Sequence, residues 1–144
     1  MKTLLKTCAT AALIVISICT MADGRPEKRT INLSMAKLAL DHYLEVITEG
    51  ESIGLEQLFA PEFCQRIQTE KSKSHSRSEI INFLKKQRGE KLNCITSYQV
   101  LEQCPNSMIA KVTLKFENFT MTDLVTLINE DGAWKVLTSV HTYQ

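Results

Sequence analysis

The chain has 144 residues, of which 44% are hydrophobic and 23% charged, and its formal net charge is +1. This length suits one domain, and a nearly neutral domain has no long-range field to concentrate a polyanion, which argues against nucleic-acid binding. The sequence contains no glycine-rich phosphate loop, no HExxH and no Cys/His spacing typical of a metal site. We therefore predict neither a cofactor nor a metal ion.

Residues 1–22 have the three-part layout of a secretory signal peptide. Two lysines precede an apolar run at 9–18, which is too short to cross a bilayer as a helix, and small residues precede a cleavage site after Ala22. Cleavage removes both lysines and no acid, so the mature net charge becomes −1. The sequence therefore predicts a secreted or periplasmic protein with no membrane contact after cleavage. A lipoprotein modified at Cys19 and an uncleaved anchor helix remain as alternatives.

Three cysteines follow the predicted cleavage site: Cys64, Cys94 and Cys104. If Cys94 and Cys104 lie on one continuous strand, the ten residues between them span roughly 33 Å. A disulfide needs Cα atoms within about 7 Å, so this pairing is excluded unless the strand is broken. A disulfide between Cys64 and one of the other two remains open, as do three unpaired thiols.

Two helices are predicted at the start of the mature chain. The polar residues 23–32 predict a flexible lead before a domain at 33–144. Ser34 suits a helix cap, and apolar residues then recur at helical spacing until Gly50 ends the helix. Leu55, Leu58 and Phe59 predict a short second helix, which the following proline stops.

A strand and a third helix are predicted next. Apolar and polar residues alternate over 63–68, which predicts a short strand. Ser76 and Glu79 form a capping box for a helix that Gly89 ends. The basic, serine-rich run KSKSHSRSEI at 71–80 is interpreted as a connector rather than a phosphate site. At most it is a rim that favours an anionic ligand.

The last third of the chain predicts four long antiparallel strands, at 92–103, 108–119, 121–130 and 133–143, rich in Val, Ile, Thr and aromatic residues. The tetrapeptides CPNS and EDGA mark two of the turns, and Asp-Gly is the strongest short hairpin signal. Helices on one face of a curved sheet make an α+β domain.

Three stretches of the chain carry a resemblance to a known superfamily: DHYLEVITEGESIGLEQLFAPEF, SRSEIINFLKK and INEDGAWKVLTSV. They resemble the nuclear transport factor 2-like superfamily, also described as SnoaL-like or cystatin-like, and its secreted bacterial branch labelled "putative lumazine-binding". The resemblance covers about 33–143. It implies a cone-shaped, strongly curved antiparallel sheet around three helices, a pocket between them, and a homodimer formed through the convex sheet face. The superfamily includes lyases, isomerases and binding modules, so the fold alone does not decide function.

Hairpin register predicts which side chains face this pocket, because opposed residues share a sheet face. With Asp131-Gly132 as a two-residue turn, Val125 opposes Thr138 and Asp123 opposes Val140. With Pro105-Asn106 as the other turn, Gln99 opposes Val112 and Ser97 opposes Leu114. The predicted pocket comprises Tyr43, Ser97, Gln99, Phe116, Asp123, Val125, Trp134, Val136, Thr138 and Val140.

Asp123 is the candidate catalytic residue, because desolvation on an apolar wall would raise its pKa and suit it to acid–base chemistry. Tyr43 is its candidate partner. In the predicted register, His141 lies on the face opposite Trp134, and this weakens the case for catalysis. We therefore favour a module that binds a small, largely apolar molecule. A lyase or isomerase using Asp123, and a protein-interaction dimer, are the alternatives.

Overall fold

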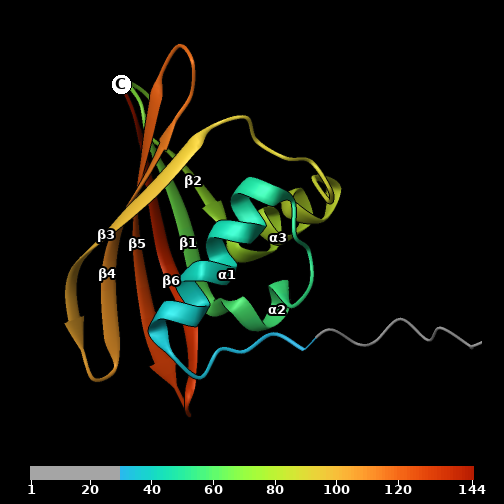
Figure 1. Ribbon diagram of the computed structural model, residues 1–144, viewed down its shortest axis with the longest axis vertical. Helices are drawn as coiled ribbons and strands as arrows, with labels where there is room; N and C mark the ends of the chain where they lie inside the picture. The colour runs from blue at the N-terminus through green and yellow to red at the C-terminus, as the bar shows by residue number, and fades with distance from the viewer. Residues whose placement is uncertain (1–29) are drawn as a thin grey trace, which may run out of the picture.

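The computed structural model describes residues 30–144, so the predicted signal peptide and the lead up to residue 29 lie outside the described residues. The elements in chain order are α1 (Ala36–Glu49), α2 (Leu55–Leu58), β1 (Phe59–Gln68), β2 (Lys73–Ser76), α3 (Arg77–Lys86), β3 (Ile95–Cys104), β4 (Ser107–Lys115), β5 (Thr120–Glu130) and β6 (Ala133–Tyr143). The strands form one sheet in the order β2-β1-β6-β5-β4-β3 (Figure 1).

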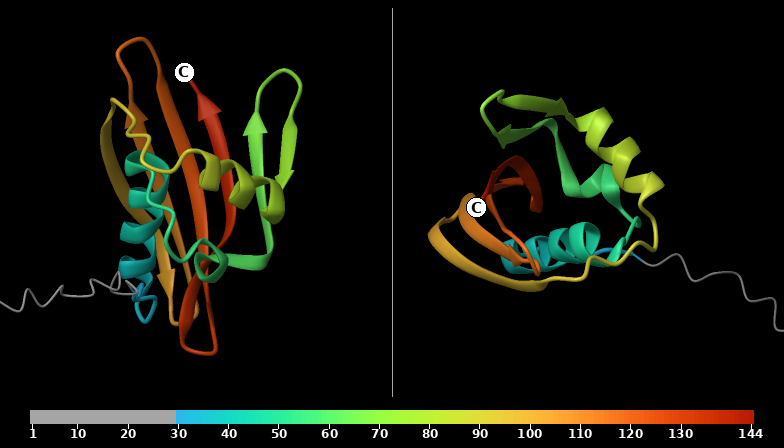
Figure 2. Two further views of the ribbon diagram at one scale, coloured as in Figure 1. Left: turned by 90° about the vertical axis from the view of Figure 1, so that its right-hand side faces the viewer. Right: turned by 90° about the horizontal axis from the view of Figure 1, so that it is seen from above.

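The sheet is curved, open and mixed. Viewed from above, it curls past α1, and α3 lies on the other side of the interior (Figure 2). The four strands at the end of the chain are antiparallel neighbours, as predicted, but β1 pairs in parallel with β6. The α+β class and the strongly curved sheet are confirmed. The expectation of a purely antiparallel sheet is wrong, because the chain enters β1 directly from α2 and runs alongside β6 in the same direction.

Helix α1 packs one apolar face against the concave side of the sheet, through Ala36, Ala39, Leu40, Tyr43 and Val46. The predicted cap at Ser34 is wrong. The N-cap is Met35, which makes no side-chain capping bond, and Ser34 Oγ instead donates to Asn32 Oδ1 at 2.7 Å. Gly50 ends the helix as predicted, with a φ of 67° in the left-handed region that glycine tolerates.

The segment after α3 is tied to the end of α1. Gly89 N donates to Gly50 O at 2.9 Å, and Leu92 N donates to Thr48 O at 2.8 Å. A Cβ atom on Gly50 would lie 2.6 Å from Glu90 N, so this approach also requires glycine. These contacts hold α1 and α3 together at one end of the interior.

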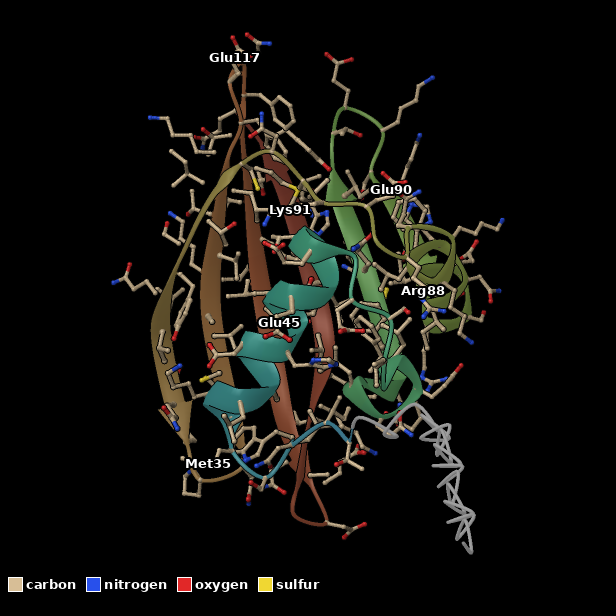
Figure 3. The ribbon with its side chains drawn as sticks, turned by 45° about the vertical axis from the view of Figure 1, so that its right-hand side comes forward. Met35, Glu45, Arg88, Glu90, Lys91 and Glu117 are labelled. Carbon is tan, nitrogen blue, oxygen red and sulfur yellow. The ribbon has the colours of Figure 1, made fainter. Side chains whose placement is uncertain are left out.

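Charged side chains cover the outer side of the helices. Figure 3 shows Glu45 on the side of α1 that faces away from the sheet, with Glu90 and Lys91 along the segment after α3. Lys91 Nζ lies 2.7 Å from Glu49 Oε2, both on exposed side chains. The helices are therefore amphipathic, and their apolar faces point inward.

The capping box predicted for α3 is confirmed. Glu79 N donates to Ser76 Oγ at 3.4 Å, and Ser76 N donates to Glu79 Oε2 at 2.7 Å. The helix ends at Lys86, three residues before the predicted stop at Gly89. The basic run before it forms β2, an edge strand antiparallel to β1, which the sequence had not separated from its loop.

Strand β1 is longer than predicted because it begins at Phe59, immediately after α2. Phe59 pairs with Val136 and Cys64 with Thr138, so the intervening residues bulge out of the ladder. Pro61 lies in this bulge, where its missing N–H costs no ladder hydrogen bond.

The β3–β4 hairpin has the predicted turn but not the predicted register. Cys104 pairs with Ser107 across Pro105-Asn106, and the register then shifts at Leu101. Beyond the shift, Ser97 pairs with Thr113 and Gln99 with Lys111, so the expected pairings with Leu114 and Val112 are wrong. The physical reason is one extra residue on β3, which reverses the faces of every residue beyond it.

The β5–β6 hairpin departs from the prediction in the same way. Its turn at Asp131-Gly132 is confirmed, with φ values of 53° and 85°, and Leu127 pairs with Val136 as expected. Leu137 is then an extra residue on β6. Val125 consequently pairs with Ser139 and Asp123 with His141, rather than with Thr138 and Val140.

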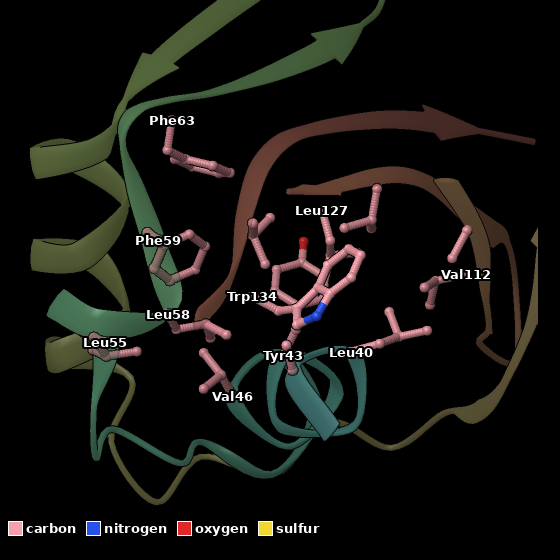
Figure 4. Close-up of a cluster of buried hydrophobic side chains, with 14 of the residues drawn as sticks. Leu40, Tyr43, Val46, Leu55, Leu58, Phe59, Phe63, Val112, Leu127 and Trp134 are labelled. Atoms are coloured by element: carbon pink, nitrogen blue, oxygen red, sulfur yellow. The ribbon is translucent and has the colours of Figure 1, made fainter. Parts of the chain in front are cut away.

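The core lies between α1 and the concave face of the sheet. Figure 4 shows Tyr43 projecting from α1 toward the interior, with Phe59 and Phe63 of β1 facing it. The Tyr43 and Phe59 rings meet edge to face with centroids 6.1 Å apart, and the Phe59 and Phe63 centroids are 4.6 Å apart. Trp134 is buried in the same core.

The three cysteines within residues 30–144 are unpaired. Cys94 precedes β3 and Cys104 ends it, so the strand separates them, as expected. Within the same residues, no helix is long and apolar enough to cross a membrane.

Candidate functional site

A cavity of about 450 Å³ opens between α1, α3, β1 and the far ends of β4, β5 and β6. Its walls are mainly apolar, with side chains from α1, β1 and α3 that include Val46, Ile47, Phe63, Ile67, Ile80 and Leu84. Besides Tyr43 and Tyr143, the lining residues with polar side chains are Gln65, His75, Glu79, Gln87, Glu90 and His141. The volume and the small number of polar groups match small-molecule sites, which span about 300–1,000 Å³.

Beneath the cavity, a fully buried carboxylate gathers three polar side chains. Asp123 has no exposed surface. Its Oδ2 accepts a hydrogen bond from the Tyr43 hydroxyl at 2.6 Å, and its Oδ1 accepts one from Ser139 Oγ at 2.8 Å. His141 Nε2 lies 3.4 Å from Asp123 Oδ2. The network joins α1, β5 and β6, and it satisfies a carboxylate that would otherwise be costly to bury.

The buried network keeps its tyrosine protonated. Burial, followed by the neighbouring Asp123 charge, raises the pKa of Tyr43 well above 10.0. Desolvation and Asp123 also raise the pKa of Tyr143, which lines the cavity. Tyr43 therefore remains a hydrogen-bond donor to Asp123, and its proton is not available for transfer near neutral pH.

His141 connects this network to the cavity. Its Nε2 atom lies 3.3 Å from Gln65 Nε2, in addition to its contact with Asp123. The ring lines the cavity and its side chain is 13% exposed. Among residues 30–144, its Nδ1 atom makes no hydrogen bond or ion pair. One ring nitrogen therefore contacts protein groups, and the other has no partner among the described residues.

Six of the ten predicted pocket residues lie in or near the interior. Tyr43 lines the cavity, and Asp123 lies behind it as the centre of the buried network. The other inward-facing members of the predicted set belong to the core and do not line the cavity: Val125, Trp134 and Val136. Phe116 stacks on Phe119 beyond the end of β4, with ring centroids 4.5 Å apart.

Four predicted pocket residues are on the wrong face. Ser97 and Gln99 are exposed on β3 and share a face with Thr113 and Lys111. Thr138 and Val140 share the outer face of β6, since Ser139 and the ring of His141 occupy the inner one. The extra residues in β3 and β6 explain both errors. The placement of His141 opposite Trp134 is wrong for the same reason.

The wall made by β1 and α3 was not predicted from the sequence. Phe63, Gln65 and Ile67 alternate along a strand that the sequence did predict, so their common face was available as a signal. The apolar face of α3 was equally visible in its helical spacing. No local signal announces the bulge at Leu137, so the position of His141 was not accessible from the sequence.

Solved structures define the class of this fold. An NTF-2 like protein of unknown function from Silicibacter pomeroyi DSS-3 matches with a TM-score of 0.61 at 16% identity, over 75% of this chain and 92% of that one. An NTF2-like protein from Cytophaga hutchinsonii matches with a TM-score of 0.60 at 16% identity, over 74% and 93%. An uncharacterized protein with a cystatin-like fold from Caulobacter vibrioides matches with a TM-score of 0.58 at 12% identity, over 75% of this chain and 86% of that one. At these identities the likeness establishes a nuclear transport factor 2-like fold.

The sequence itself assigns the family. Residues 32–142 match the family described as "Putative lumazine-binding", and the chain belongs to it. A comparison with curated proteins gives no significant match. Among residues 30–144, no group of three or more His, Cys, Asp or Glu side chains is arranged to hold a metal ion.

Proposed function

We propose that this protein is a binding module for a small, largely apolar molecule, which enters the cavity between α1, α3 and β1. The main support for this proposal is the cavity of about 450 Å³, which has mainly apolar walls and His141 at its floor. The family description supports a ligand of this size, since lumazine is a bicyclic heteroaromatic compound. Apolar walls would take the ring system, and the few polar groups would orient it.

The position of Asp123 favours binding over catalysis by that residue. Its carboxylate is fully buried and receives hydroxyl groups from Tyr43 and Ser139. It does not line the cavity, so it is not placed to exchange a proton with a ligand. We assign Asp123 a positioning role, in which it orients Tyr43 and His141.

Calorimetric titration with lumazine and with 2-naphthamide tests the proposal. Ile67→Trp should fill the cavity and weaken binding of either probe at least tenfold, because Ile67 lines its wall. Arg66→Trp is the matched control, since Arg66 is the exposed neighbour on the opposite face of β1. Failure of both probes to bind, or equal affinity in both variants, would contradict the proposal.

A proton-transfer enzyme is a second candidate, and one observation favours it. His141 lines the cavity and has Asp123 3.4 Å behind it, the geometry of a base with an orienting carboxylate. Deuterium exchange into a bound ligand, followed by NMR, tests this function. If the protein is an enzyme of this kind, it should exchange deuterium into the ligand faster than solvent alone does, and His141→Gln should abolish this excess. Absence of excess exchange in the unmodified protein would contradict the enzyme function.

We also propose that the protein is exported and that it forms a homodimer through the convex face of the sheet. Export is supported by the pattern at 1–22. The dimer is supported by two exposed apolar residues of that face, Ile95 and Leu124. N-terminal sequencing of the exported protein should begin at Asp23, and sedimentation equilibrium should give a dimer that Leu124→Lys dissociates.

A further inference from the structure

The floor of the cavity, where His141 lies next to Asp123, indicates the chemistry of the ligand more closely than the apolar walls do. We infer that the ligand carries an anionic oxygen, as in a small aromatic carboxylic acid or enolate, and that His141 binds this oxygen through Nδ1. This inference rests on the proposed binding function and narrows it to one class of ligand. It depends on the charge of Asp123 and on the two ring nitrogens of His141.

Asp123 needs a positive partner. A carboxylate without exposed surface is unfavourable unless it is paired as well as hydrogen-bonded. The hydroxyl groups of Tyr43 and Ser139 supply two hydrogen bonds but no charge. Among residues 30–144, His141 is the group that can be cationic and that approaches Asp123 to ion-pair distance. His141 is therefore the side chain placed to balance the charge of the buried carboxylate.

The two nitrogens of His141 face different partners. Nε2 is engaged by Asp123 Oδ2 at 3.4 Å and by the Gln65 amide at 3.3 Å. In the imidazolium form both nitrogens donate. Nδ1 then carries a charged N–H that has no acceptor within residues 30–144. If the Gln65 amide nitrogen donates to Nε2, the neutral ring also carries its hydrogen on Nδ1. With Gln65 as that donor, the floor presents an N–H at Nδ1 in either form.

The other titratable groups around His141 do not supply a positive charge next to Asp123. Tyr43 and Tyr143 have pKa values raised by burial and by Asp123, so both are neutral near pH 7. Two further titratable groups line the cavity: His75 on β2 and Glu90 in the segment after α3.

Glu79 also lines the cavity, but its carboxylate is occupied by the cap of α3. It accepts hydrogen bonds from Ser76 N at 2.7 Å and from Ser76 Oγ at 2.9 Å, which lowers its pKa. Arg77 is likewise engaged, with Glu56 at 3.1 Å. Lys71 and Lys73 are exposed beside the β2 wall and favour the approach of an anion.

A matched pair of probes separates charge from shape. 2-Naphthoate and 2-naphthamide have the same ring system, and only the first carries an anionic oxygen. If His141 binds the anionic oxygen as a cation, naphthoate should bind more tightly at about pH 5 than at about pH 8, with a loss of at most about tenfold per pH unit. Naphthamide should bind with nearly constant affinity across the same range.

Two histidine variants locate the effect. His141→Gln keeps a hydrogen-bonding group and removes the charge, so naphthoate affinity should fall about tenfold at pH 5 and its pH dependence should disappear. Naphthamide affinity should change less than about threefold, within the range of one neutral hydrogen bond. His42→Gln is the control, because His42 does not line the cavity, and its pH profile should match that of the unmodified protein.

The outcomes are distinguishable. Equal pH profiles for naphthoate and naphthamide, or a pH dependence that survives His141→Gln, would overturn the anion site while leaving a binding cavity. Binding of neither probe would contradict the proposed function together with this inference. A circular dichroism spectrum and an unfolding curve for each variant ensure that lost affinity is not lost folding.

Discussion

The two β-hairpins of the sheet, β3–β4 and β5–β6, have the same construction and opposite surroundings. Each has a two-residue turn at the position expected from its turn residues. Each also contains one extra residue, Leu101 in β3 and Leu137 in β6, that reverses the faces of the strand beyond it. The same irregularity therefore occurs once at the sheet edge and once near its centre.

In β5–β6 the extra residue creates the floor of the candidate site. The reversal brings Ser139 and His141 to the face of Asp123 and turns Thr138 and Val140 away. Because α1 covers this part of the sheet, each inward side chain must be packed or hydrogen-bonded. Two hydroxyl groups and an imidazole reach Asp123 in consequence.

In β3–β4 the extra residue changes few buried contacts, because β3 is exposed along its length. Tyr98 and Val100 turn inward, opposite Val112 and Ala110, but they remain 38% and 40% exposed. Ser97 and Gln99 turn outward into solvent. The difference between the hairpins shows that a bulge changes the contacts of polar side chains mainly where the strand is buried. An exposed strand satisfies its polar groups with water in either register.

The largest expected difference comes from Asp123→Ala. This substitution leaves the buried hydroxyls of Tyr43 and Ser139 without their acceptor, and we expect a loss of about 3 kcal/mol in the free energy of unfolding. Gln99→Ala, on the exposed hairpin, should change it by less than about 0.5 kcal/mol. Urea unfolding followed by the fluorescence of Trp134, the single tryptophan, measures both. Similar losses in the two variants would remove the contrast between the hairpins.

Adjacent positions on β6 test the register directly. Ser139→Ala removes a buried donor to Asp123 and should cost about 1–2 kcal/mol. Thr138→Ala changes the opposite face and should cost less than about 0.5 kcal/mol. Urea midpoints at constant m-value give the comparison. If Thr138→Ala proved the more costly, β6 would have the register without a bulge.

Alkaline pH should weaken the centre of the sheet more than its edge. Because the pKa of Tyr43 is raised well above 10.0 in the folded protein, the unfolded chain loses this proton first as the pH rises. The associated stability is complete below about pH 10 and declines above it. Tyr43→Phe should cost about 1 kcal/mol at neutral pH and should flatten the alkaline decline of the urea midpoint.

Tyr143→Phe serves as the control for this pH effect. Its pKa is raised by partial burial and by Asp123, so it contributes a weaker alkaline decline of the same sign. An unchanged decline in Tyr43→Phe would show that the buried tyrosine is not its source.

The smallest effect is expected at the inward face of β3. Val100→Thr should change the free energy of unfolding by less than about 0.5 kcal/mol, because Val100 is already 40% exposed. Val112→Thr, on the neighbouring strand and fully buried, should cost about 1–2 kcal/mol through its new hydroxyl group. Thermal unfolding of the pair suffices as a measurement. Equal costs would mean that β3 is covered in solution, for example by a second copy of the chain.

Features that depend on a few neighbouring residues were predictable from the sequence alone. The capping box of Ser76 and Glu79, the helix end at Gly50 and the turn at Asp131-Gly132 were predictable, because each uses a local hydrogen bond or a backbone angle that few residues adopt. Together with the order of the elements, these features were enough for the α+β class. The nuclear transport factor 2-like fold was predicted from the resemblance of three stretches of the chain to that superfamily.

Beyond the extra residues of β3 and β6, which side chains face the interior depends on tertiary contacts. The composition of the candidate site depends on them as well. Asp123 and Tyr43 were recognisable as candidates, but Ser139 and His141 joined them only through the bulge at Leu137. Local propensity does not specify where an extra residue enters a strand. That position is decided by contacts between α1, β5 and β6, which lie far apart in the sequence and meet only in the folded core.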